Sequence, residues 1–396
     1  MFQDETIICF GSRQWDINHM VSQNHIMSHL SHDNDVLYIE SLGARTIRLD
    51  DFKRILRRLK HAILSPPAPG EAGFQAKNRD SGVLSALVIP YHKNFWINRF
   101  NQWALLRQID SAMKDWNRRH PIVWTYQVNP TIAKIARSLQ PKLWIHHSVD
   151  QIFLHRNIPD PEWLRRTEAQ MLSQADIILV SAYGLKAEKE PYNSNILHVP
   201  NSVDTELFAF SGDGIYPPPP RLQNMPRPII GFVGALDFWV NLPLLNQIAE
   251  AFPHGSVVQV GSAPSVKSRP ELKPNLHLIG PIPHRELPTH IAAMDVCLIP
   301  YLLTPFTQFT FPSKLMEYLA VGRPVVSTPL PEVVRYEGVV AIGRTHEDFV
   351  ARVKEAVESD TPEFRRRRRE VAQVHSWPAQ LERIWQHCRP LMRDNG

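Results

Sequence analysis

Lys314 and Glu317 have the types and spacing to bind a phosphorylated sugar. Lys314 follows Pro312-Ser313 at the start of an apolar, helix-length segment, and Glu317 lies three positions further along it. Free N–H groups and the positive end of the helix dipole favour an anion there, so Lys314 and the backbone from Ser313 onward could hold a diphosphate. Glu317, on the same helix face, could accept hydrogen bonds from two neighbouring sugar hydroxyls. Taken alone, such a pair is more often an exposed ion pair.

The elements around this pair are those of a parallel α/β domain. Gly322 and Pro324 end the helical segment just before the β-branched pair Val325-Val326. Other β-forming runs, separated mostly by helix-length segments, lie at 229–233, 257–260, 276–279, 296–299 and 339–342. Gly234 follows the first of them and would let a ligand approach the backbone closely, although glycine is also an ordinary turn residue.

The first half of the chain shows the same alternation. Its β-forming runs lie at 6–10, 36–39, 84–89, 122–126, 143–146, 177–180 and 196–199. Ligands approach parallel sheets at the loops that follow the strands, so the loop after the first run, with Ser12 and Arg13, is a candidate cleft lining. This loop contains no GxGxxG motif. We expect two domains, because 396 residues exceed what one hydrophobic core usually supports.

Proline and capping residues set the expected domain boundaries. Residues 1–205 form an N-terminal domain, and residues 206–228 form a linker, because the four consecutive prolines at 217–220 cannot continue a helix or a central strand. Residues 229–375 form a C-terminal domain. Residues 376–396 begin with Ser376, which is suited to cap a helix, and are long enough to pack back on the N-terminal domain.

The composition predicts a globular, cytoplasmic protein. It contains 43% hydrophobic and 21% charged residues, and the net charge of +5 favours anionic partners. Cys9, Cys297 and Cys388 lie far apart without metal-ligand spacing, which favours a reducing compartment. The N-terminus is acidic where a signal peptide is basic, and no stretch approaches the roughly 20 apolar residues of a membrane span.

Two basic segments with interleaved aromatic residues suit an anionic membrane surface. They are 52–61 and 95–119, separated in part by a Pro/Gly-rich loop at 65–80, and the second contains Trp96 and Trp103. Tryptophan favours the membrane interface, so a peripheral position on the inner face of the cell membrane is one expectation; a packed helix with its charges in water is the other. Five arginines at 365–369 would point all round a helix, so we interpret them as a solvated helix end and expect no nucleic-acid partner.

These elements resemble the group 1 (family 4-like) GT-B glycosyltransferases, and within them a bacterial polysaccharide-assembly branch. The resemblance covers most of the chain. Its motifs are Glu168 followed by Ala175-Asp176 and a strand, Pro200-Asn201-Ser202-Val203-Asp204 with Phe208, the strand end at 231–234, the run at 295–300, and the stretch with Lys314, Glu317, Gly322 and Pro324. The resemblance implies the GT-B architecture, an α/β fold in which two Rossmann-like domains face each other across a cleft.

The resemblance also implies the donor site. Glu317 would bind the ribose hydroxyls of a nucleotide sugar, Lys314 and the backbone from Ser313 would face the diphosphate, and Gly234 would leave room for the phosphates. The chain departs from the broad family in two places: residues 235–241 lack the arginine and lysine that many members have, and Phe309 stands where they have a first glutamate. Lys314 is therefore the main cation expected at the diphosphate.

On the acceptor side, the resemblance places an aspartate near Asp150, which follows the run at 143–146. An attacking hydroxyl must lose its proton, so Asp150 is the expected general base, and His147 is an alternative base or the orienting partner. An isolated aspartate at such a position is more often a helix cap. Ser12 and Arg13 are expected on the acceptor side. No acidic pair suited to Mg²⁺ occurs in a loop, so we expect metal-independent transfer.

The expected function is that of a glycosyltransferase without a cofactor. It would move a sugar from a nucleotide-diphosphate sugar to a glycan or lipid-linked glycan acceptor in polysaccharide or glycoconjugate biosynthesis. Two alternatives stay open: a non-catalytic GT-B-like protein that binds glycan or nucleotide, and a sugar-nucleotide epimerase or a phosphorylase on the same fold. A phosphorylase would need a buried lysine for pyridoxal phosphate, and no lysine in the sequence indicates one.

Overall fold

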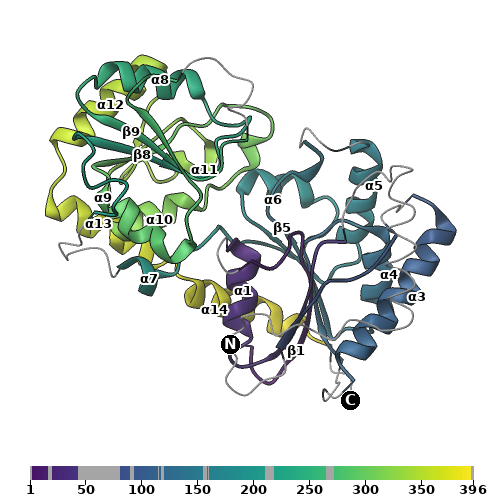
Figure 1. Cartoon of the computed structure of the whole chain (residues 1–396). Coiled ribbons are helices and arrows are strands. Elements are labelled where there is room, and N and C mark those ends of the chain that lie inside the picture. The colour runs from purple at the N-terminus through teal and green to yellow at the C-terminus, as the bar shows by residue number, and fades with distance from the viewer. Residues whose placement is uncertain are drawn as a thin grey trace. The chain divides into compact units, whose positions relative to one another are not determined.

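A computed structural model describes residues 2–16, 20–42, 81–89, 93–114, 116, 120–154, 158, 160–209, 218–264 and 272–393. The expected helix at 52–61, the loop at 65–80 and part of the linker lie outside them. The chain divides into two compact units (Figure 1). Unit 1 consists of Met1–Val180, Leu185–Val199 and Leu381–Gly396, and unit 2 of Ser181–Gly184 and Pro200–Gln380.

Unit 1 is built on a parallel sheet of seven strands in the order β3-β2-β1-β4-β5-β6-β7. The strands are β1 (Thr6–Phe10), β2 (Asp35–Ile39), β3 (Ser81–Leu84), β4 (Ile122–Thr125), β5 (Leu143–Ser148), β6 (Ile177–Val180) and β7 (Ile196–His198). The helical elements are α1 (Ser22–Leu30), α3 (Phe95–Ala112), α4 (Pro130–Ser138), η2 (Ile152–Leu154), α5 (Pro161–Leu172) and α6 (Tyr183–Lys189). All residues of β1, β4 and β5 are buried, as expected for central strands covered on both faces.

The prediction of a strand at 84–89 is wrong, because the third strand is Ser81–Leu84. Beyond it, the backbone bonds to amide side chains of α3. Gln108 accepts a hydrogen bond from the N–H of Leu87 at 2.9 Å, and Asn101 bonds to both the N–H and the C=O of Ile89 at 2.9 and 2.8 Å. These amides satisfy backbone groups that a strand would otherwise offer to its neighbour.

Unit 2 is built on a parallel sheet of six strands in the order β10-β9-β8-β11-β12-β13. The strands are β8 (Ile229–Val233), β9 (Ser256–Val260), β10 (Leu276–Gly280), β11 (Val296–Ile299), β12 (Val325–Ser327) and β13 (Ala341–Ile342). The helical elements are α7 (Thr205–Ala209), α8 (Leu242–Ala251), η4 (His284–Glu286), α9 (Leu287–Ala293), η5 (Thr307–Phe309), α10 (Lys314–Val321), α11 (Pro331–Val334), α12 (His346–Glu358) and α13 (Pro362–Gln373). α14 (Trp377–Cys388) begins in unit 2 and continues into unit 1, which also contains η6 (Arg389–Leu391). Two parallel α/β units confirm the expected fold class.

Two aspartates of the family motifs tie strands together. Asp176 accepts a hydrogen bond from the N–H of Trp144 near the start of β5, and Asp295 accepts one from the N–H of Ile229 at the start of β8, both at 2.7 Å. Each aspartate precedes the neighbouring strand, at the amino-terminal edge of its sheet. Ligands approach the opposite edge, so both positions are structural.

The arginine run at 365–369 is partly buried, so its interpretation as a solvated helix end is wrong for Arg368. This side chain is buried, pairs with Asp360 at 2.6 Å and donates to the carbonyl of Gly322 at 3.0 Å. Gly322 ends α10 in the left-handed conformation, with φ of +86°. Arg368 therefore holds α13 against the end of the helix that begins at Lys314.

Candidate active site

Lys314 and Gly234 lie against each other at the carboxyl ends of the unit 2 strands. Gly234 follows β8 with φ of +140°, and a β-carbon there would lie 2.9 Å from Cε of Lys314. The Nζ of Lys314 donates to the hydroxyl of Tyr301 at 2.7 Å and lies 5.9 Å from the centre of the Phe232 ring. The ammonium group is thus fixed between the first strand-end loop of the unit and the start of α10.

Ser313 and Glu317 complete the set of predicted donor residues. Ser313 directly precedes α10, and its side chain accepts no capping hydrogen bond from this helix. Glu317 lies in the first turn, with its Oε1 atom 3.6 Å from Nε2 of His284. The ring of His284 packs against Phe208, 5.5 Å between centres. The structure therefore brings the predicted donor residues together at one end of α10, and ribose binding by Glu317 would compete with His284.

Ser12, Arg13 and Asp150 lie at the carboxyl edge of the unit 1 sheet, where β1, β4 and β5 are neighbours. Ser12 donates from its N–H and its hydroxyl to Gln23, at 3.0 and 3.3 Å. Asp150 is exposed, yet desolvation by the surrounding protein raises the pKa of its carboxyl to about 6, while the charge of Arg13 acts in the opposite direction. An accessible carboxyl with a raised pKa suits a general base.

His146 and His147 are buried within β5. Burial lowers the pKa of both rings to about 3, helped by the charge of Lys189 at His146 and by His146 at His147. The ring of His147 stacks on Tyr126 at 4.9 Å, and its Nδ1 atom has no hydrogen-bond partner among the described residues. A buried ring offers little surface to an acceptor, which favours Asp150 over His147 as the base.

Sequence reasoning misses a buried ion pair in unit 1. The Nζ atom of Lys189 lies 2.9 Å from Oε1 of Glu168, and the two side chains are 1% and 4% exposed. The sequence gives no indication that Lys189 is buried. The two residues are 21 positions apart on different helices, so no local pattern reveals the pair. Sequence reasoning also misses Tyr301, whose hydroxyl accepts the hydrogen bond from Lys314. Its position soon after the end of β11 is the one sequence feature that could have indicated a place in the site.

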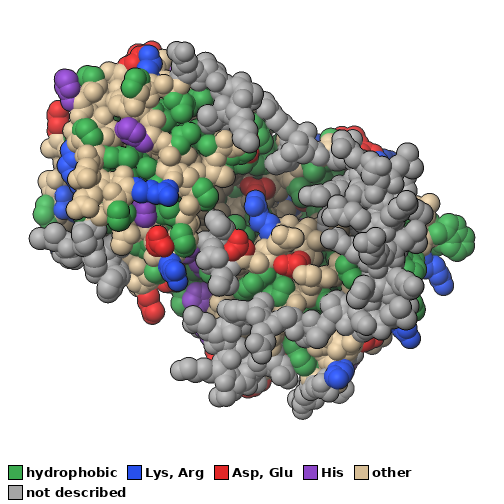
Figure 2. Space-filling view, in the orientation of Figure 1, with side chains coloured by type: hydrophobic (Ala, Val, Ile, Leu, Met, Phe, Trp, Pro, Cys, Tyr) green, Lys and Arg blue, Asp and Glu red, His purple; other side chains and the backbone are tan. Residues whose placement is uncertain are grey.

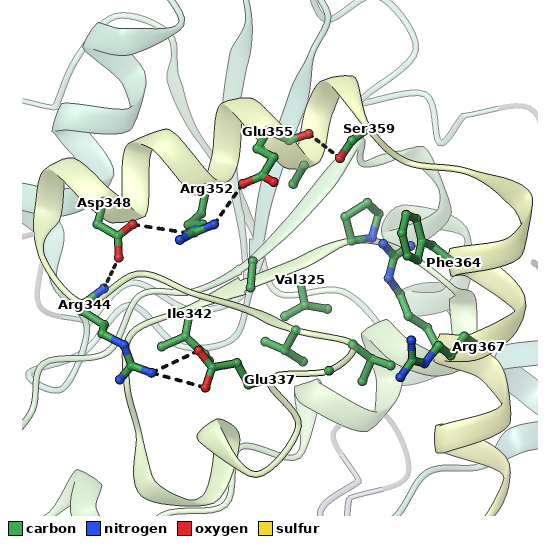
Figure 3. A pocket seen from close by; sticks show the side chains of 17 residues that line it. Val325, Glu337, Ile342, Arg344, Asp348, Arg352, Glu355, Ser359, Phe364 and Arg367 are labelled. Carbon is green, nitrogen blue, oxygen red and sulfur yellow. Dashed lines mark hydrogen bonds and ion pairs between the residues drawn. The ribbon is translucent and has the colours of Figure 1, made fainter.

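A separate cavity of about 450 Å³ lies beside β13, and Figure 3 shows its lining. Five of its charged side chains pair with one another: Arg344 with Glu337 at 3.0 Å, and Arg352 with Asp348 at 3.3 Å and Glu355 at 3.1 Å. Arg367 and Arg368 also line it. None of the predicted site residues lines this cavity. Its rim is an ion-pair framework on the edge of unit 2.

The described residues contain no cluster of metal ligands, no helix that could cross a bilayer and no exposed thiol. Among the described residues, no three His, Cys, Asp or Glu side chains gather in the way that a metal ion requires. Within the same ranges, no helix has both the length and the apolar character to cross a bilayer. Cys9, Cys297 and Cys388 are buried free thiols, and burial raises the pKa of Cys297 and of Cys388 to about 12, so these thiols are unreactive.

Known proteins resemble this chain in sequence. Residues 227–359, which include Gly234, Lys314 and Glu317, match the family described as "Glycosyl transferases group 1". A protein of Bacillus subtilis (strain 168), named "Putative teichuronic acid biosynthesis glycosyltransferase TuaH", is 26% identical over 239 residues. Both comparisons therefore show similarity to group 1 glycosyltransferases, over part of the chain. The alignment covers 57% of this chain and 59% of TuaH, so it spans about three-fifths of the relative's length.

Solved structures share the fold of this chain. Sucrose-phosphate synthase from Thermosynechococcus elongatus superposes with a TM-score of 0.67 at 15% identity, covering 98% of this chain and 99% of that one. HepE from Anabaena, solved in complex with UDP, superposes with a TM-score of 0.64 at 13% identity, covering 97% of this chain and 100% of HepE. These likenesses extend over nearly the whole chain and confirm the expected GT-B fold.

Proposed function

We propose that this protein moves a sugar from a nucleotide-diphosphate sugar to a hydroxyl of a glycan or lipid-linked glycan in polysaccharide or glycoconjugate biosynthesis. The observation that carries the proposal is the contact between Lys314 and Gly234. It sets an ammonium group beside a backbone without a β-carbon, where two phosphates can approach. UDP in HepE supports the donor class, and the name of TuaH supports the acceptor class.

In the proposed reaction, an acceptor oxygen bonds to the anomeric carbon as the bond from that carbon to the diphosphate breaks. Asp150 takes the proton of the acceptor hydroxyl, with Ser12 and Arg13 on the acceptor side. Lys314 and the N–H groups from Ser313 onward stabilise the negative charge that develops on the leaving diphosphate. Glu317 exchanges its contact with His284 for the ribose hydroxyls.

We propose that transfer is metal-independent and uses no cofactor, because the Lys314 ammonium and the helix terminus neutralise the diphosphate. The test is the initial rate after dialysis against EDTA, with and without added Mg²⁺. An unchanged rate is expected. A rate that falls on dialysis and returns with Mg²⁺ would contradict this part of the proposal.

Nucleotide binding tests the donor site. Isothermal titration of the whole protein with UDP, GDP and dTDP should detect binding of at least one. Lys314→Ala removes a charge-assisted hydrogen bond worth about 1.5–3 kcal/mol, so Kd should rise by about 10-fold or more. Lys354→Ala, at an exposed lysine of α12, is the control and should leave Kd unchanged. Absence of binding to all three nucleotides, or equal affinity in both variants, would contradict the proposal.

We also propose a cytoplasmic protein that binds peripherally to the inner face of the cell membrane through α3. Phe95, Trp96 and Trp103 are 59%, 73% and 47% exposed, so these aromatic side chains are not packed in the core. The guanidinium of Arg107 lies 5.1 Å from the Trp103 ring, and the ammonium of Lys134 lies 5.3 Å from the Phe95 ring. Figure 2 shows hydrophobic and basic side chains together at the edge where Figure 1 places α3. This combination suits an anionic lipid surface.

Sedimentation with vesicles tests this second part. The protein should pellet with phosphatidylglycerol vesicles and remain in solution with phosphatidylcholine vesicles. Trp96→Ala with Trp103→Ala should reduce the pelleted fraction several-fold. Leu303→Ala, at a 55% exposed apolar residue of unit 2, is the control. Binding that persists in the tryptophan variant would exclude α3 as the membrane contact.

A further inference from the structure

One buried ion pair fastens the loop of Asp150 from both sides. Glu168 on α5 and Lys189 on α6 form this pair at 2.9 Å. Ser148, two positions before Asp150, donates its hydroxyl to Glu168 at 3.3 Å. Gln151, directly after Asp150, accepts from Nζ of Lys189 at 3.3 Å. Two helices are thereby joined to the two residues that bracket the proposed base.

Stability alone does not account for this arrangement. Removing two charges from water costs several kcal/mol per ion, and apolar residues of similar size in place of such a pair are often as stable or more stable. Ser148 and Gln151 are buried too, so their polar atoms need partners inside the protein. The ion pair supplies these partners at the point where β5 ends and the loop begins.

We propose that Glu168 and Lys189 are positioning residues that hold Asp150 where it accepts a proton from the acceptor. The inference rests on the proposed function, because it assigns this role to Asp150. Both residues are buried and act through Ser148 and Gln151 without touching a substrate. A reacting group displaced by about 1 Å can lose roughly 100-fold in rate.

The proposal predicts a defect in kcat without a defect in donor binding. The proposed donor residues belong to unit 2, whereas Glu168, Lys189 and Asp150 belong to unit 1. Loss of the anchors should therefore lower kcat by about 10- to 100-fold. The Kd of the nucleotide and the KM of the donor should stay within about twofold of the wild-type values.

The test replaces the pair by apolar residues in the whole protein. Glu168→Leu with Lys189→Met should stay folded, with a cooperative urea transition and the wild-type Kd for nucleotide, yet show the reduced kcat. The matched control is Glu5→Leu with Lys142→Met, an ion pair of the same unit at the opposite edge of the sheet. The control should keep the wild-type kcat. A loss of kcat in a folded variant that still binds nucleotide at the wild-type Kd cannot come from a merely structural role.

Each outcome decides the proposal. A folded double variant with wild-type kcat overturns it, and so does a control that loses as much activity. If the double variant does not fold, Gln151→Leu removes one anchor and keeps the ion pair; a wild-type kcat in that variant also overturns the proposal. A wild-type protein that binds nucleotide but transfers no sugar overturns the proposed function instead, before any variant is compared.

Discussion

Gly234→Ala is expected to weaken nucleotide binding by displacing Lys314. The new β-carbon would lie 2.9 Å from Cε and 3.4 Å from Nζ of Lys314, and 3.3 Å from the Phe232 ring. Lys314 must move, so its 2.7 Å hydrogen bond to Tyr301 is lost or weakened. Loss of its charge-assisted contact with phosphate removes about 1.5–3 kcal/mol, which raises Kd by about 10- to 150-fold. An alanine is strained at the positive φ of this position, so Gly234→Ala should also lower the free energy of unfolding by about 1–3 kcal/mol.

Gly280→Ala separates these two effects. Gly280 also has a positive φ, +84°, at the end of a unit 2 strand, but nothing lies within 4 Å of its would-be β-carbon. Both variants should lose folding stability in urea unfolding, whereas isothermal titration should show a raised Kd in Gly234→Ala alone. Equal nucleotide affinity in the two variants would refute the role assigned to the contact with Lys314.

Three further predictions concern pH and a buried ion pair. The pKa of Asp150 is raised to about 6, so kcat/KM should climb as pH rises through this value. Asp150→Asn should abolish the climb. The same pH profile in this variant would contradict the role of Asp150 as the general base. His146 and His147 have pKa values lowered from 6.5 to about 3, so the unfolded chain binds more protons between these values. The free energy of unfolding is therefore highest above about pH 6.5, where both rings are neutral in the folded and unfolded chain. As pH drops below 6.5, it falls by up to about 1.4 kcal/mol per pH unit for each ring. Urea unfolding at pH 7 and 5 should show this fall, with a smaller one in His147→Asn; equal slopes would contradict it. Arg368→Met removes one of the two ion pairs of Asp360, which keeps Arg365 at 2.6 Å, and the hydrogen bond to the Gly322 carbonyl. It should lower the unfolding free energy by about 1.5–3 kcal/mol, and an unchanged urea midpoint would show that these contacts are not stabilising.

Much of the fold could be predicted because buried parallel strands are continuous apolar runs. The runs at 6–10, 177–180, 229–233 and 296–299 coincide with β1, β6, β8 and β11. The prediction for 84–89 is wrong because polar side chains of α3 form the hydrogen bonds with the backbone that a neighbouring strand would otherwise form. Hydrophobic patterns carry no information about such side-chain partners.

The candidate site could also be predicted only in part. Gly234 ends a predicted strand and Lys314 begins a predicted helix, and carboxyl ends of neighbouring strands lie at one sheet edge, so their proximity could be anticipated. The pairing of Glu168 with Lys189 could not, because it joins two helices through side-chain contacts. The burial of His147 could not be predicted either, because a histidine in a strand can belong to an active site or to the hydrophobic core.

The most direct test of sugar transfer is a turnover assay with a panel of nucleotide-diphosphate sugars. Purified protein is incubated with each donor, with and without lipid-linked glycan acceptors, and the released nucleoside diphosphate is measured. We predict that one donor is consumed, faster with a suitable acceptor, and that Asp150→Asn slows consumption by about 100- to 10,000-fold while nucleotide still binds. Nucleotide binding without consumption of any donor would contradict the assignment as an active transferase and indicate a binding protein.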